Sequence, residues 1–117
     1  MKKIMIISFI LIILILFMTN NKEHLYISNS KIQGIGLYSD KIYNPNEKIF
    51  LGIKNDHTIT ELGSKINHCN MPNTYLQKDD DGWYLYSAYV INKDEELTVD
   101  YNYTPNFIDK SHVDWKC

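Results

Sequence analysis

The feature that most limits the fold of this sequence is the absence of a long amphipathic helical pattern after residue 21. From residue 22 onward, short apolar runs alternate with clusters of polar and turn-forming residues, a pattern typical of short strands joined by tight turns. Only residues 59 to 66, ITELGSKI, fit a turn or two of helix. The sequence therefore predicts one mostly β domain over residues 22 to 117.

The first 21 residues have a different composition. Residues 4 to 18 are apolar except for Ser8, and two lysines precede them. The run is short for a membrane-spanning helix, which needs about 17 to 25 residues, and lies at the upper end of the length range for the core of a signal peptide. No small-residue cleavage pattern follows it, so residues 1 to 21 are predicted to be an uncleaved membrane-anchor helix, with a cleaved signal as the alternative.

The positions of the lysines predict the orientation of this single-pass anchor. Lys2 and Lys3 would keep the N-terminus in the cytosol and place the domain across the membrane, although Lys22 beyond the run weakens the bias. The side of the membrane that carries the domain therefore stays open.

Charge and cysteine content exclude some classes of protein. A formal net charge of −2 argues against direct nucleic-acid binding. Cys69 and Cys117 are the only cysteines, which allows one disulfide or two free thiols but no disulfide framework.

Several strands follow from local patterns. Residues 24 to 28 and 48 to 53 are short strand candidates, and the clearest hairpin joins residues 74 to 78 to residues 83 to 90 through the turn DDDG. Aromatic residues alternate onto both faces of the returning strand, so we expect it to be buried on both sides.

Two polar turns have the same design. Asn46 follows Pro45 in the turn Asn-Pro-Asn-Glu, and Asp94 occupies the corresponding place in the turn Asn-Lys-Asp-Glu. Asn46 stands at a turn position that tolerates left-handed backbone geometry, and both Asn and Asp are tolerated at such turn positions.

A polar stretch, KINHCNMPNTY at residues 65 to 75, has no strand or helix period and many groups that need hydrogen bonds when buried. By itself it is either a surface loop or a polar site. A second segment, EELTVDYNY at residues 95 to 103, stands out with it.

Together these segments resemble the signatures of the SET-domain protein-lysine methyltransferases. The family's Asn-His-Ser-Cys-x-Pro-Asn run is matched at residues 67 to 73, and its Glu-Glu-Leu-Thr-x-Asp-Tyr run is matched at residues 95 to 101. Its opening Gly-x-Gly element resembles residues 34 to 37, followed by a turn at residues 42 to 47. The three elements occur in the family's order.

The resemblance implies a SET-type β-clip fold with a knot-like C-terminal segment, in which both signatures meet and bind S-adenosyl-L-methionine. It implies Tyr101 as the catalytic residue and Tyr103, Tyr75 and Tyr86 as walls of the substrate channel. The implied cofactor-binding residues are Gly34, Ile35, Gly36, Leu37, Asn67, His68, Tyr101 and Trp115. The implied partner is a protein with a target lysine.

Three departures from the family pattern bear on function. Cys69-Asn70 replaces the Ser-Cys pair, the stretch from 53 to 65 is shorter than the usual substrate-groove insert, and only Cys117 stands where many relatives have three zinc-binding cysteines. We expect no metal, although zinc on Cys69, His112, Cys117 and another histidine is a minor alternative.

The prediction from the sequence is a membrane-anchored protein-lysine N-methyltransferase that resembles the compact SET proteins of large DNA viruses. The alternative is a catalytically degenerate SET-fold module that binds or has a structural role on a membrane.

Overall fold

The computed structural model describes residues 24–110 and residue 117. The predicted anchor and Trp115 lie outside these residues. Within them, no helix is both long enough and apolar enough to cross a bilayer.

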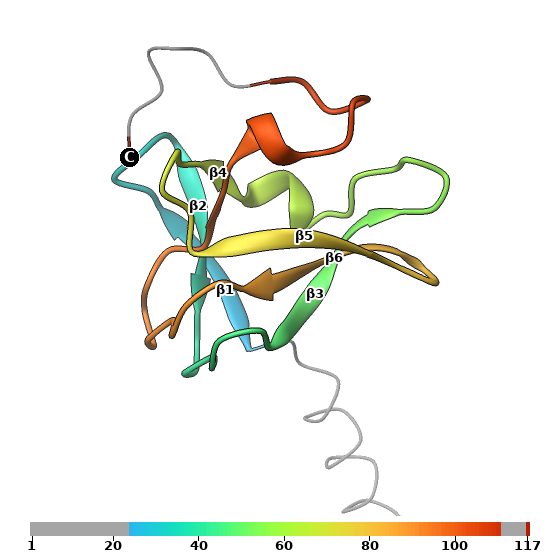
Figure 1. Cartoon of the computed structure of the whole chain (residues 1–117). Coiled ribbons are helices and arrows are strands. Elements are labelled where there is room, and N and C mark those ends of the chain that lie inside the picture. Colours follow the sequence, from blue (N-terminus) through green and yellow to red (C-terminus); the bar gives the residue numbers. More distant parts are fainter. Residues whose placement is uncertain (1–23, 111–116) are drawn as a thin grey trace, which may run out of the picture.

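The described chain forms three small sheets, which confirms the mostly β prediction (Figure 1). One pairs β1 (Leu25–Asn29) with β2 (Ile35–Ser39), and one orders β3 (Lys48–Lys54), β6 (Gly82–Ser87) and β5 (Thr74–Asp79) with β6 in the middle. The third pairs β4 (Asn67–His68) with β7 (Thr98–Val99), and the 3-10 helices are η1 (Gly63–Lys65) and η2 (Tyr101–Tyr103).

The predicted hairpin is present as β5 and β6, paired from Thr74↔Ser87 to Asp79↔Gly82. Gly82 has a φ of +143°, and a Cβ there would collide with the backbone oxygen of Ile53, so the turn requires glycine. The return strand ends at Ser87 rather than continuing to residue 90. Tyr89 and Val90 are consequently 67% and 49% exposed, and the prediction of burial on both faces was wrong for them.

The two turns of one design are confirmed. Asn46 has a φ of 64° and Asp94 a φ of 70°, both left-handed. In each turn, the amide of the following glutamate donates to the carbonyl of the asparagine three residues earlier, at 3.2 Å. The side chain of Asn46 accepts a hydrogen bond from the hydroxyl of Tyr75 at 2.9 Å, and that of Asp94 accepts one from the hydroxyl of Tyr26 at 2.7 Å. These bonds fix the turns to neighbouring strands.

The core lies between the sheets. Leu37, Leu85, Ile91 and Leu97 are at most 2% exposed, and each comes from a different part of the chain. The bridge between Tyr43 and Ile91 joins the segment before β3 to the segment before β7. Burial of these apolar side chains thus holds the polar segments of the chain at fixed positions.

Candidate functional site

The two polar segments lie side by side. β4 and β7 pair in parallel, with Asn67 opposite Thr98 and His68 opposite Val99. The amide of Cys69 extends the pairing by donating to the carbonyl of Val99 at 3.0 Å. The predicted meeting of the two segments is confirmed, and it places His68 next to Tyr101.

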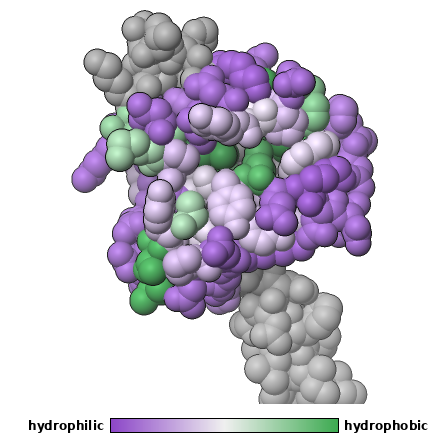
Figure 2. All heavy atoms as spheres, in the orientation of Figure 1, coloured by the Kyte–Doolittle hydropathy of each residue, from purple (hydrophilic) through white to green (hydrophobic). Residues whose placement is uncertain are grey.

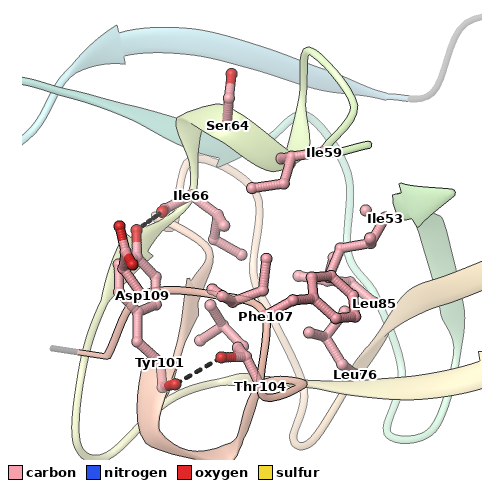
Figure 3. A pocket seen from close by; sticks show the side chains of 14 residues that line it. Ile53, Ile59, Ser64, Ile66, Leu76, Leu85, Tyr101, Thr104, Phe107 and Asp109 are labelled. Atoms are coloured by element: carbon pink, nitrogen blue, oxygen red, sulfur yellow. Dashed lines mark hydrogen bonds between the residues drawn. The ribbon is translucent and has the colours of Figure 1, made fainter. Parts of the chain in front are cut away.

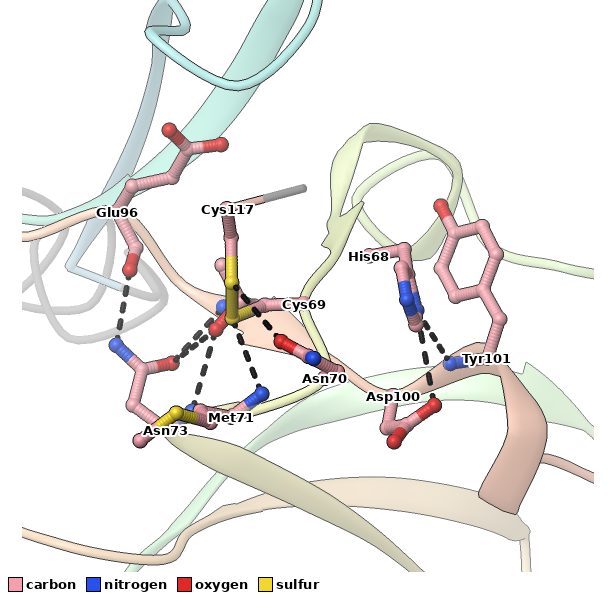
Figure 4. The surroundings of a disulfide bond; sticks show 10 residues. His68, Cys69, Asn70, Met71, Asn73, Glu96, Asp100, Tyr101 and Cys117 are labelled. Carbon is pink, nitrogen blue, oxygen red and sulfur yellow. Dashed lines mark hydrogen bonds and ion pairs between the residues drawn. A yellow bond between two sulfur atoms is a disulfide. The ribbon is translucent and has the colours of Figure 1, made fainter. Parts of the chain in front are cut away.

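Asn73 fixes this pairing from the side. Its Nδ2 donates to the carbonyl of Glu96 at 2.9 Å, and its Oδ1 accepts the amide of Thr98 at 2.8 Å (Figure 4). Thr74 adds a buried hydroxyl bond to the carbonyl of Thr98 at 2.6 Å. A two-residue strand pair is too short to be stable alone, and these side chains supply the missing backbone partners.

His68 is buried and has a defined tautomer. Its Nδ1 accepts the backbone amide of Tyr101 at 3.0 Å, so this nitrogen carries no proton and the ring is a neutral imidazole protonated at Nε2. The carboxylate of Asp100 lies 3.7 Å from the same nitrogen, but without a proton on Nδ1 the two groups do not form an ion pair. The His68 and Tyr101 rings pack 5.4 Å apart.

Tyr101 is fixed at several atoms. Its hydroxyl donates to the carbonyl of Ile66 at 2.6 Å, and its carbonyl accepts the hydroxyl of Thr104 at 2.6 Å. Burial raises the pKa of the Tyr101 phenol above its usual value of 10.0. The phenol is therefore protonated at neutral pH and acts as a hydrogen-bond donor, not as a base.

Tyr101 lines two hollows. The large hollow, of about 350 Å³, lies against β3 and the segment after η2, and Figure 3 shows the apolar side chains that line most of it. They include Ile53, Ile59, Ile66, Leu76, Leu85 and Phe107. The small hollow, of about 210 Å³, is lined by Ile32, Gln33, Asn67, His68 and Tyr101. In Figure 2 the surface is mostly hydrophilic, with hydrophobic residues visible inside a recess and at the edges.

The glycine element lies close to the small hollow but does not line it. Leu37 points into the core, and Ile32 and Gln33, just before Gly34, supply the lining. Gly34 has a φ of +52°. A Cβ on Gly36 would overlap the carboxylate of Glu96, so this glycine makes room for a side chain of the protein itself.

Asn67 is engaged inside the protein. Its Nδ2 lies 2.8 Å from Oε2 of Glu96 and 3.1 Å from each of three oxygens of residues 30 to 35. The Asn67 side chain thus links the residues around the start of β2 to Glu96, in the segment before β7.

The predicted channel tyrosines lie elsewhere. Tyr75 and Tyr103 line a third hollow of about 200 Å³, and Tyr86 stacks on Tyr75 with ring centroids 5.6 Å apart. Tyr103 is 86% exposed. Tyr101 does not line this third hollow.

Sequence reasoning missed the large hollow and its residues Ile59, Phe107, Ile108 and Asp109. The segment that carries the last three is fixed by aromatic packing, because Phe107 stacks on His57 at 3.9 Å and meets Trp83 edge-on at 5.4 Å. These rings are far apart in sequence and follow no period, so only a pairing signal between them could have revealed the hollow.

The open question about the cysteines is resolved in favour of a bridge. Cys69, the residue after His68, forms a disulfide with Cys117, and their Cα atoms are 5.2 Å apart (Figure 4). In the part of the chain that the structure describes, no group of three or more His, Cys, Asp or Glu side chains could hold a metal ion.

Comparison with solved structures gives the class of fold. The described domain has a methyltransferase-like fold: the chain is similar to a candidate histone methyltransferase of Plasmodium falciparum, with a TM-score of 0.59 and 21% identity, covering 71% of this chain and 96% of that one. At this identity the likeness concerns the fold alone. No protein-family model matches the sequence, and no curated protein is similar to it.

Proposed function

We propose that this protein is a protein-lysine N-methyltransferase that uses S-adenosyl-L-methionine. The observation that carries the proposal is that one fixed tyrosine, Tyr101, forms a wall of both a small polar hollow and a large apolar hollow. A group transfer needs its donor and acceptor to meet at one aligned point, and two hollows that share a wall supply that arrangement. The fold shared with a candidate histone methyltransferase supports the same class of reaction.

The small hollow is the proposed donor site. Its lining combines the polar side chains of Gln33 and Asn67 with Ile32 and two rings, a mixture suited to a ligand that has a charged amino-acid end and a flat base. Its volume of about 210 Å³ is below the usual 300–1,000 Å³ of small-molecule sites. We therefore propose that Trp115 adds a further wall. When bound, S-adenosyl-L-methionine would supply a methyl group on a sulfonium, ready for in-line displacement.

The large hollow is the proposed acceptor site. Its aliphatic walls suit the stem of a lysine side chain, and a bound stem that displaces water from these walls would favour the neutral amine that attacks a methyl group. The phenol of Tyr101 stays protonated and anchored to Ile66, so its part is to position the reactants.

A membrane anchor at residues 4 to 18 is part of the proposal and rests on the sequence. The disulfide is typical of proteins on the oxidising side of a membrane, which agrees with the orientation that the N-terminal lysines favour. Protease protection of the domain in sealed vesicles decides its side. S-adenosyl-L-methionine is abundant in the cytosol, so digestion from the cytosolic side would favour methyl transfer, and a protected domain would count heavily against it.

A second candidate function is a SET-like module that binds without transferring a methyl group. It is favoured by the engagement of the Asn67 amide inside the protein and by the small volume beside His68. Cofactor binding separates the two functions.

The test is a calorimetric titration of the full chain, in detergent, with S-adenosyl-L-methionine, followed by incubation with labelled cofactor and a cell lysate. The proposal predicts saturable heat and label recovered as methyllysine. No heat and no label would leave the binding module as the better account.

A further inference from the structure

Among the described residues, one charged side chain, that of Asp109, lines the large hollow. Three hydroxyl groups of its lining already donate hydrogen bonds within the protein: Ser64 to the carbonyl of Glu61, Thr104 to that of Tyr101, and Tyr101 to that of Ile66. Asp109 differs from them. Among the described residues, no lysine or histidine lies within ion-pair distance of its carboxylate.

The neighbouring cation is engaged elsewhere. The amine of Lys110 donates to the carbonyls of Thr104 and Pro105, at 2.9 and 3.4 Å. The Asp109 carboxylate is therefore an available, exposed negative charge in a lining that is mostly apolar.

Asp109 lies across the hollow from part of its aliphatic lining (Figure 3). Figure 3 shows Asp109 and Tyr101 on one side of the hollow and Ile53, Leu76 and Leu85 on the other. A ligand that fits both sides has an apolar chain and a cationic end. A purely aliphatic ligand would bury apolar surface without using the carboxylate, and an anionic ligand would be repelled by it.

We propose that Asp109 is a specificity-determining residue that selects an alkylammonium group for the large hollow. The inference rests on the proposed function in one respect: if the protein is a methyltransferase, the natural ligand of this hollow is the side chain of the acceptor lysine. Asp109 attracts the protonated acceptor as it enters. Its action is on binding, and it takes no part in the transfer step.

The test uses a matched pair of small probes that needs no cofactor. n-Pentylammonium and 1-pentanol have the same chain length and differ in the charge of the head group. NMR titration of the full chain at low salt and about pH 7 should give a dissociation constant about three- to fivefold lower for the ammonium, the range of a solvent-exposed ion pair. Salt at about 1 M should remove this preference.

Three variants complete the test. Asp109→Asn should bind the two probes equally, and Asp109→Glu should keep the preference. Asp80→Asn, which makes the same charge change at the exposed tip of the β5–β6 hairpin, should also keep it. With a lysine peptide as substrate, Asp109→Asn should raise KM about three- to fivefold and leave kcat unchanged.

Equal binding of both probes to the unaltered protein would overturn the inference, as would a preference that survives Asp109→Asn. The outcome for the proposed function can be distinguished from the outcome for this inference. If the ammonium preference depends on Asp109 but no methyl transfer occurs, the proposed function fails and the inference stands. If transfer occurs with the same KM in Asp109→Asn, the inference fails and the proposed function stands.

Discussion

At the scale of single residues, the need for glycine at position 36 is explained by Glu96, a residue far away in the sequence. The Glu96 carboxylate fills the space where a Cβ of residue 36 would be and accepts hydrogen bonds from Ser30, Tyr38 and Asn67. The resemblance assigned the glycine to a cofactor. The structure gives it an internal partner 60 positions away, which no local pattern could identify.

Gly36→Ala should lower the free energy of unfolding by about 1–3 kcal/mol, because the new methyl group overlaps the Glu96 carboxylate. Glu96→Ala should relieve part of this cost, which gives a favourable coupling energy in a double-mutant cycle measured by urea denaturation. Gly34→Ala is the control, since a Cβ at that position would have no atom within 4 Å and only the φ of +52° causes strain. Additive effects of the Gly36 and Glu96 changes would refute this explanation.

The hydrogen bond of Tyr26 predicts how the stability of the protein changes at high pH. The hydrogen bond to Asp94 raises the pKa of Tyr26 to about 12, above the usual value of 10.0. Between about pH 10 and 12 the unfolded chain therefore loses this proton while the folded protein keeps it, so the free energy of unfolding falls as pH rises through that window. Tyr26→Phe should lose less stability there than the unaltered protein does. Urea denaturation curves at about pH 9 and about pH 11.5 give the loss of unfolding free energy for each protein. Equal losses in Tyr26→Phe and the unaltered protein would contradict the raised pKa of Tyr26.

At the scale of elements, the short β4–β7 pair is supported from the side by Asn73. Asn73 bonds the amide of Thr98 and the carbonyl of Glu96, both on the chain leading into and through β7. Asn73→Ala should lower the free energy of unfolding by about 2–4 kcal/mol, because two backbone groups lose their partners. Asn70→Ala, at an exposed position of the same segment, should change it by less than about 0.5 kcal/mol in urea denaturation. Similar losses in both variants would show that Asn73 is not the support described.

The elements differ in how well the sequence predicts them. The β5–β6 hairpin and the left-handed turns at Asn46 and Asp94 depend on neighbouring residues, so local patterns located them. β4 and β7 are two residues each and have no period, so only the family resemblance placed them together. The large hollow was not predicted, because it forms where β3, β6 and the segment after η2 meet.

At the scale of the whole molecule, the disulfide joins Cys117 to Cys69, the residue after His68. It closes a loop across a sequence separation of 48, and constraint of the unfolded chain over such a loop is worth about 4 kcal/mol in the chain-entropy model. For a domain of this size, whose core is only marginally sufficient, that is a large share of the stability. The same bond keeps Cys117 next to the segment that carries His68.

The whole arrangement depends on Tyr101 as the shared wall of the two hollows. The most direct test is methyl transfer to lysine peptides by the full chain and by Tyr101→Phe, with cofactor affinity measured in parallel. Tyr89→Phe is the control, at an exposed residue that lines neither these two hollows nor the third one beside Tyr103. The account predicts that Tyr101→Phe lowers kcat about a hundredfold, as loss of one positioned donor does elsewhere, while the dissociation constant of S-adenosyl-L-methionine changes less than about threefold. Undiminished turnover in Tyr101→Phe would contradict it.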